Sequence, residues 1–155
     1  MASNPASKTT KRKATKPRAA QKVMSTSVRA NRNPVEISIL VPVMNEAGNI
    51  RPLIDEICTA FAGRRLEIIY IDDASNDATA NELAAALDAV PQLRVLRHAQ
   101  RAGQSAAIQS GLLQANGDLI GVLDGDGQNV PADFSALESS VIAASKDGKM
   151  VMAAG

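Results

Sequence analysis

The sequence predicts an α/β protein with a mostly parallel sheet and helices on both of its faces. Short β-branched apolar runs, such as Ile37–Val43 and Leu66–Ile71, alternate with segments in which apolar residues recur at helical spacing. Hydrophobic residues make up 45% of the chain and aromatic residues only 2%, so Ile, Leu, Val and Ala must fill the core. This alternation is typical of a parallel sheet covered on both faces.

Further elements are expected in order along the chain. Apolar residues from Ile50 to Phe61 recur at helical spacing, with Asn49 as a plausible N-cap, so this segment is the first predicted helix. A second helix is expected between the polar turn at 72–77 and Pro91. The remaining predicted elements are a strand at 93–96, a helix at 103–115, a strand at 119–123, a helix after Pro131 and a fifth strand beginning at 149–153.

The charged residues divide the chain into two parts. Residues 1–33 hold nine of the 17 Lys and Arg residues and none of the 16 Asp and Glu residues. Residues 34–155 therefore have eight basic residues against 16 acidic ones, a net charge of −8. Because residues 1–33 also have almost no large apolar side chains, they are predicted to be a disordered basic arm, with the folded part at 34–155.

The basic arm leaves several interpretations open. It is either a solvated extension or a contact with an anionic membrane surface, where each basic residue contributes about 1 kcal/mol. An acid-poor organelle transit peptide is a further alternative. Nucleic-acid binding is not expected, because the arm has no aromatic side chains to stack on bases. The single cysteine, Cys58, agrees with a reducing compartment, and no apolar run approaches the ~20 residues that span a bilayer. We therefore expect a cytoplasmic protein that contacts the inner face of the cell membrane peripherally through the arm.

Polar residues follow three of the predicted strands directly. Asn45 and Glu46 follow the first strand, Asp72 and Asp73 the second, and the segment 124–128 the strand at 119–123. Ligands of open parallel sheets bind beyond the carboxyl ends of the strands. Three acidic loops are therefore predicted to converge on one ligand site, rather than to form a solvated rim.

The pair Asp124 and Asp126 predicts a divalent metal site. Two carboxylates about 5 Å apart repel by about 3 kcal/mol at an effective dielectric constant near 20, and a cation removes this penalty. Oxygen ligands from the two carboxylates and the carbonyl of Gln128 suit Mg²⁺ or Mn²⁺. The glycine between the two acids, Gly125, lets a phosphate approach the backbone closely.

Asp73 is predicted to bind a nucleotide base. A carboxylate at this strand end can accept the imide N–H of uracil or the N–H groups of guanine, and such a bond contributes about 1.5–3 kcal/mol. One guanidinium among Arg94, Arg97 and Arg101 could lie near a diphosphate, although most of them are expected on a solvated face. For His98, the only histidine, we expect a plain surface role.

Four motifs in order resemble those of family 2 glycosyltransferases. The first two are Pro42-Val-Met-Asn-Glu46 and Glu67-Ile-Ile-Tyr-Ile-Asp-Asp-Ala-Ser-Asn-Asp-Ala-Thr79. The third runs from Gly103-Gln-Ser-Ala-Ala to Asp118, and the fourth is Leu123-Asp-Gly-Asp-Gly-Gln-Asn-Val-Pro131. Within the family, they resemble the branch of dolichyl-phosphate mannosyltransferases and polyprenyl-phosphate glycosyltransferases. Two positions depart from the pattern: Met44 replaces a usual aromatic residue, and Ala102 replaces a common Lys.

The resemblance implies a Rossmann-like fold of the glycosyltransferase A type, with 34–155 as its nucleotide-sugar-binding part. It also implies roles for individual residues. The nucleotide pocket would be lined by Pro42, Asn45 and Glu46, and the base would be contacted by Ile71 and Asp73. The donor diphosphate would be bound by Asp124, Gly125 and Asp126, the metal would be held by Asp124, Asp126 and Gln128, and Asp126 would be the catalytic residue.

The implied activity is a metal-dependent, inverting hexosyl transfer in the synthesis of cell-envelope glycans. The donor would be a GDP- or UDP-linked sugar and the acceptor a polyprenyl phosphate. Family domains continue past this length, so we expect a truncated chain that lacks the acceptor-binding half, binds nucleotide weakly and turns over no donor.

Two further interpretations assign the chain to functional classes other than a glycosyltransferase. One is a catalytically inactive nucleotide-binding module that docks to a membrane or partner through the arm. The other, a response-regulator receiver, is disfavoured because a receiver has its phospho-acceptor Asp at the third strand, where this chain has Arg97 and His98.

Overall fold

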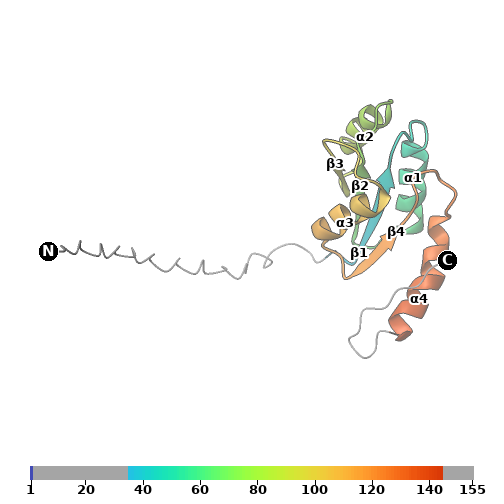
Figure 1. Ribbon diagram of the computed structural model, residues 1–155. Coiled ribbons are helices and arrows are strands. Elements are labelled where there is room, and N and C mark those ends of the chain that lie inside the picture. The colour runs from blue at the N-terminus through green and yellow to red at the C-terminus, as the bar shows by residue number, and fades with distance from the viewer. Residues whose placement is uncertain (2–34, 145–155) are drawn as a thin grey trace. The chain divides into compact units, whose positions relative to one another are not determined.

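The computed structural model describes Met1 and residues 35–144, which include four strands and five helical segments (Figure 1). Apolar β-branched runs form the strands, and segments with helical apolar spacing form the helices, as the sequence predicts. The elements in chain order are β1 (Ile37–Val43), α1 (Ile50–Ala60), β2 (Leu66–Asp72), α2 (Thr79–Leu87), β3 (Leu93–Arg97), α3 (Gln104–Gln114), β4 (Leu119–Val122), the 3₁₀ helix η1 (Pro131–Asp133) and α4 (Phe134–Ala144).

The four described strands form one parallel sheet in the order β3-β2-β1-β4. In β1, Ile37 lies opposite Leu66 of β2 and Leu119 of β4, so the three strands are in register. The chain proceeds outward from β1 through β2 to β3 and then returns to the other side of β1 as β4. The junction of β1 and β4 is therefore a topological switch point, where α/β sheets bind ligands.

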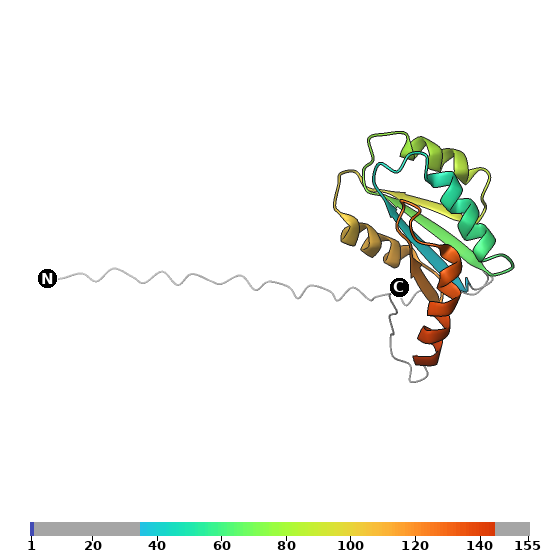
Figure 2. The ribbon, with the colours of Figure 1, turned by 90° about the vertical axis from the view of Figure 1, so that its right-hand side faces the viewer.

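Helices cover both faces of the sheet, so β1 and β2 are apolar on both sides (Figure 2). On one face, Ile39 and Val41 of β1 pack with Leu53 and Ile57 of α1 and with Leu83 of α2. The opposite face carries α3, whose Ala107 packs against a smaller cluster made of Leu40, Ile69 and Ile71.

Helix α3 lies close to the sheet because a glycine faces it. A Cβ atom added to Gly111 would lie 2.9 Å from Cδ1 of Ile71 and 3.2 Å from Cδ2 of Leu40. These separations are shorter than ordinary contacts between side chains, so a larger residue would push α3 outward. Helix α3 is thereby held against β1 and β2.

A buried polar network fastens the end of the sheet that lies opposite the switch point. Glu67 of β2, whose side chain is 8% exposed, accepts hydrogen bonds from the Ser38 hydroxyl at 2.7 Å and the Asn116 backbone N–H at 2.6 Å. Arg94 of β3 donates to the same carboxylate at 2.9 Å and also to the carbonyl of Gln114 at 2.8 Å. The network joins three strands to the turn after α3.

The predicted fold class is confirmed, and most differences concern boundaries. The strand expected at 93–96 extends to Arg97, and the one expected at 119–123 ends at Val122. Asn49 is the N-cap of α1, but its side chain donates to Glu46 Oε2 at 3.0 Å and makes no cap hydrogen bond. The basic arm and the strand expected at 149–153 lie outside the described residues and stay predictions.

Candidate functional site

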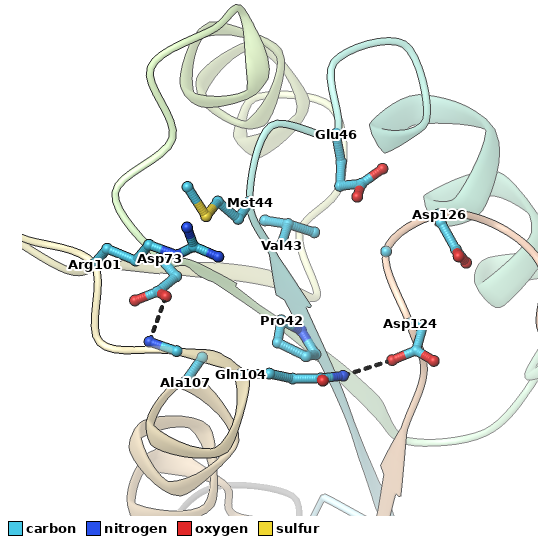
Figure 3. Close-up of a pocket in the computed structure, with 12 residues that line it drawn as sticks. Pro42, Val43, Met44, Glu46, Asp73, Arg101, Gln104, Ala107, Asp124 and Asp126 are labelled. Carbon is cyan, nitrogen blue, oxygen red and sulfur yellow. Dashed lines mark hydrogen bonds between the residues drawn. The ribbon is translucent and has the colours of Figure 1, made fainter.

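The loops after β1, β2 and β4 and the start of α3 line a pocket of about 350 Å³ (Figure 3). It lies at the carboxyl ends of the strands and spans the switch point between β1 and β4. Six of the residues predicted for the site are among those that line it: Pro42, Glu46, Asp73, Asp124, Gly125 and Asp126. The other lining residues are Val43, Met44, Arg101, Gly103, Gln104 and Ala107.

The loop after β1 is held by hydrogen bonds to the loop after β2. The Asn45 backbone N–H donates to the Ser75 hydroxyl at 3.0 Å, and the Glu46 N–H donates to the Thr79 hydroxyl at 2.9 Å. Asn45 has a positive φ of 60°, and its side-chain oxygen accepts the Asn76 N–H at 2.9 Å. Asn45 therefore shapes the turn and lies outside the set that lines the pocket, whereas Glu46 lines it.

The two acids after β2 have different environments. Asp72 is fully buried, accepts the Ser75 N–H at 2.8 Å and lies 3.1 Å from Nε of Arg97. Asp73 is only 4% exposed, yet it lines the pocket. Asp72 therefore holds the turn together, while Asp73 is placed to meet a ligand.

Asp73 is held by donors from the segment between β3 and α3. Its carboxylate accepts the backbone N–H of Ala102 at 2.8 Å and that of Gly103 at 2.7 Å, and His98 Nδ1 lies 2.7 Å away. Burial alone would raise the pKa of Asp73, but hydrogen bonds from His98 and the two backbone N–H groups outweigh it and lower the pKa. The ionised carboxylate is thus the stable form in the pocket.

The expected surface role of His98 was wrong. The side chain is only 18% exposed, and its Nε2 lies 3.0 Å from the Ser110 hydroxyl of α3. No local motif indicates this contact, because His98 is 25 residues from Asp73 in the sequence. The position directly after β3 was the one available signal, since parallel strands bring their carboxyl ends to the same edge.

The loop after β4 brings two exposed carboxylates to the pocket. Asp124 accepts a hydrogen bond from the Gln104 side chain at 2.9 Å, and Asp126 accepts the Gln128 backbone N–H at 3.0 Å. A Cβ added to Gly125 would lie 2.4 Å from Cγ1 of Val43, so this loop passes over the end of β1 only with glycine at that position.

Three residues predicted for the site lie outside the pocket lining. Besides Asn45, these are Ile71 and Gln128. The Ile71 side chain is fully buried in the cluster beneath α3, and Gln128 is exposed. Their expected contacts with base and metal stay predictions.

Among the three arginines considered from the sequence, Arg101 lines the pocket. Figure 3 shows its side chain beside Met44 and Asp73. Arg94 and Arg97 are paired with Glu67 and Asp72, at 2.9 Å and 3.1 Å. Arg101 is therefore the one basic residue among the described residues that line the pocket, which include four acids.

The pocket has donor atoms that fit a divalent metal, although they are few. Within residues 35–144, no group of three or more His, Cys, Asp and Glu side chains could hold an ion. The loop after β4 contributes two carboxylates to the pocket lining, those of Asp124 and Asp126. Two carboxylates fit the usual coordination of Mg²⁺ in nucleotide sites, where substrate phosphates and waters supply the remaining oxygen ligands.

A polar pocket at the switch point of a parallel sheet is the place where open α/β proteins bind their ligands. The sequence model of glycosyl transferase family 2 matches residues 38–148. The chain therefore belongs to glycosyl transferase family 2, as its motifs predicted.

Several curated relatives carry names from the expected branch of the family. A dodecaprenyl-phosphate galacturonate synthase of Rhizobium johnstonii is 36% identical over 74% of this chain and 36% of its own length. A dolichyl-phosphate beta-glucosyltransferase of Trichomonas vaginalis is 34% identical over 69% of this chain and 34% of its own. The chain thus spans about a third of the length of these relatives.

Solved structures confirm the fold of the glycosyltransferase A type. A mannosyltransferase from Pyrobaculum calidifontis in complex with GDP-Man and Mn²⁺ matches with a TM-score of 0.58 at 26% identity, over 65% of this chain and 30% of that one. TarS from S. aureus in complex with UDP-GlcNAc also matches with a TM-score of 0.58, over 76% of this chain and 37% of that one. At 18% identity, the second match bears on the fold alone.

Within the described part of the chain, no helix is both long and apolar enough to cross a membrane. The expected cytoplasmic location and the peripheral membrane contact stay predictions.

Proposed function

We propose that the chain is the donor-binding part of a glycosyltransferase that moves a sugar from a nucleotide diphosphate sugar to a polyprenyl phosphate. The observation that carries the proposal is that Asp73, Asp124 and Asp126 line one pocket at the switch point. Family membership and the names of the two relatives above, which contain dodecaprenyl phosphate and dolichyl phosphate, support the acceptor class.

The layout of the strands suits an extended donor. Asp73 follows β2 and the pair Asp124 and Asp126 follows β4, with β1 between these strands. Since neighbouring strands are about 4.8 Å apart, the two ends of the pocket are separated by about 10 Å. The base would bind at Asp73 and the diphosphate near Asp124 and Asp126, with Pro42 and Glu46 between them.

A divalent ion, Mg²⁺ or Mn²⁺, would be held by Asp124 and Asp126, with Gln128 completing the predicted set. Bound there, the ion would supply Lewis-acid stabilisation of the charge that grows on the leaving diphosphate. The chain's own residues bind and orient the donor. Asp126, the predicted catalytic residue, is among the residues that line the pocket.

The acceptor chemistry requires positioning more than proton removal. A phosphate monoester is largely ionised at neutral pH, because its second pKa is about 6. Attack by this oxyanion on the face of the sugar opposite the diphosphate would invert the anomeric carbon. An acceptor of this kind therefore does not require any of the carboxylates that line the pocket to act as a general base.

Calorimetric titration of UDP and GDP with and without Mn²⁺ tests the proposal. We expect metal-dependent binding that falls at least about 10-fold in an Asp124→Ala/Asp126→Ala double variant, since each charge-assisted contact contributes about 1.5–3 kcal/mol. The matched control is Asp118→Ala, an exposed acid at the opposite end of β4, which should keep the affinity of the parent chain. Equal binding by the double variant and the parent would refute the metal site.

The alternative is a nucleotide-binding or docking module without catalysis. It would bind its membrane or protein partner unchanged in the double variant and show no affinity for either nucleotide. Nucleotide affinity that depends on both aspartates and on Mn²⁺ would exclude it.

A further inference from the structure

The hydrogen bonds around Asp73 limit what its carboxylate can still accept. Oδ1 accepts the Ala102 N–H at 2.8 Å and lies 2.7 Å from His98 Nδ1, while Oδ2 accepts the Gly103 N–H at 2.7 Å. An ionised carboxylate is an acceptor only, so Nδ1 of His98 carries the proton that it donates. The other ring nitrogen, Nε2, lies 3.0 Å from the Ser110 hydroxyl, which fixes the ring.

One acceptor position of Asp73 therefore stays open. A carboxylate has about four lone-pair sites, two on each oxygen. Within the described part of the chain, both sites of Oδ1 have donors and Oδ2 has a single donor, Gly103. Since Asp73 lines the pocket, the open site on Oδ2 is available to one N–H group of a ligand.

Uracil and guanine differ in the number of donors that they present. The base-pairing edge of uracil has a single N–H between two carbonyl oxygens. The same edge of guanine has two neighbouring donors, the ring N–H and the exocyclic amino group, beside one carbonyl. A single open acceptor satisfies uracil, but it leaves one guanine donor without a partner.

The remaining pocket residues favour the same base. Arg101 lies beside Asp73 and can donate to a carbonyl that flanks the uracil N–H (Figure 3). The other side-chain carboxylates of the pocket, on Glu46, Asp124 and Asp126, follow β1 and β4 rather than β2. Asp124 and Asp126 belong to the end of the pocket assigned above to the diphosphate. Figure 3 shows the Glu46 side chain apart from Asp73, beyond Met44 and Val43, so the second donor of guanine finds no side-chain carboxylate beside Asp73.

We propose that His98, with the Ala102 and Gly103 N–H groups, restricts Asp73 to one open acceptor and so selects uridine diphosphate over guanosine diphosphate donors. This specificity rests on the proposed function of the pocket. His98 is a positioning residue in this account, because it acts through Asp73.

Competitive titration of UDP and GDP, each with Mn²⁺, against the 155-residue chain tests the selection. We expect UDP to bind at least about 10-fold more tightly, because an unpaired buried donor costs about that much in affinity. Equal or tighter binding of GDP would overturn the selection and leave the proposed nucleotide site intact. Failure of both nucleotides to bind would overturn the site and the selection together.

Variants at His98 separate positioning from folding. His98→Leu removes the donor to Oδ1 and opens a second acceptor, so the ratio of UDP affinity to GDP affinity should fall at least about 5-fold. His98→Asn places an amide N–H near the position of Nδ1 and should retain most of the ratio. Ser110→Ala loosens the ring and should lower the ratio less than His98→Leu does.

Circular dichroism and thermal unfolding check that each variant is folded. A folded His98→Leu protein with the ratio of the parent chain would overturn the role of His98. Should His98→Leu fail to fold, an unchanged ratio in folded Ser110→Ala would overturn it instead.

Discussion

At the scale of single residues, the pocket depends on side chains that position other groups. Asp73 could be predicted from its place after β2, and it lines the pocket. His98 could not, because its contacts with Asp73 and Ser110 form only when β2, β3 and α3 are assembled. Ile71 shows the opposite case, since Asp73, two residues further along the chain, lines the pocket while the Ile71 side chain is buried beneath α3.

Gly125 should be required for nucleotide binding. In Gly125→Ala, the added Cβ would lie 2.4 Å from Cγ1 of Val43 and 3.2 Å from the carbonyl oxygen of Pro42. Overpacking of this kind typically costs about 1–3 kcal/mol, and its relief would move Asp124 and Asp126 away from the pocket. We expect nucleotide affinity to fall by about 10-fold or more in calorimetric titration.

The matched control for this prediction is Gly127→Ala in the same loop. Gly127 has φ of +73° and no atom within 4 Å of an added Cβ, so alanine there strains the backbone without a collision. It should cost about 1 kcal/mol of stability and leave the affinity within a few-fold of the parent chain. Equal losses of affinity in both variants would show that backbone strain, and not the contact with Val43, accounts for the effect.

At the scale of elements, the periodicity of apolar residues was sufficient to predict every described strand and α-helix. It did not fix their ends, because hydrogen bonds across the sheet decide where pairing stops. Arg97 extends β3 because it pairs with Asp72 of β2 in the sheet register. The contacts of the polar network at Glu67 were also not predictable, since Ser38, Arg94 and Asn116 come from three separate segments.

The network at Glu67 should make stability depend on pH. Burial would raise the pKa of Glu67, but hydrogen bonds from Ser38, Asn116 and Arg94 outweigh it and lower the pKa. A lowered pKa in the folded state means that the ionised group contributes stability above its unfolded pKa. That contribution is lost as the pH falls through the lower, folded pKa.

Glu67→Gln tests this dependence. At neutral pH the variant should lose about 1–3 kcal/mol in the free energy of unfolding, because the hydrogen bonds to a charged group are weakened. The difference between the two proteins should shrink as the pH falls below the usual range of a glutamate, as measured by urea unfolding at a series of pH values. Arg51→Gln, which breaks an exposed pair with Asp55, serves as the control and should change stability little at any pH. A difference at Glu67 that is constant with pH would contradict the assignment.

At the scale of the whole molecule, charge is distributed very unevenly along the chain. Nine Lys and Arg residues lie in 1–33, whereas 34–155 has a net charge of −8. A polyprenyl phosphate acceptor would be embedded in a membrane, so a transferase of this branch must work at a lipid surface. The acidic part of the chain would be repelled by anionic lipid headgroups, and the basic residues of 1–33 would be attracted to them.

We therefore expect the chain to bind anionic vesicles through residues 1–33. Each basic residue near such a surface contributes about 1 kcal/mol, so several engaged together suffice for measurable binding. In vesicle sedimentation, the chain should pellet with phosphatidylglycerol vesicles at low salt, remain in the supernatant with phosphatidylcholine, and be released at high salt as the charges are screened. A variant with glutamine at all nine basic positions keeps the length of the arm and should not pellet.

Because this variant leaves the pocket unchanged, it should still bind nucleotide as the parent chain does. Pelleting of the glutamine variant would contradict an electrostatic contact, and failure of the parent chain to pellet would favour a solvated arm.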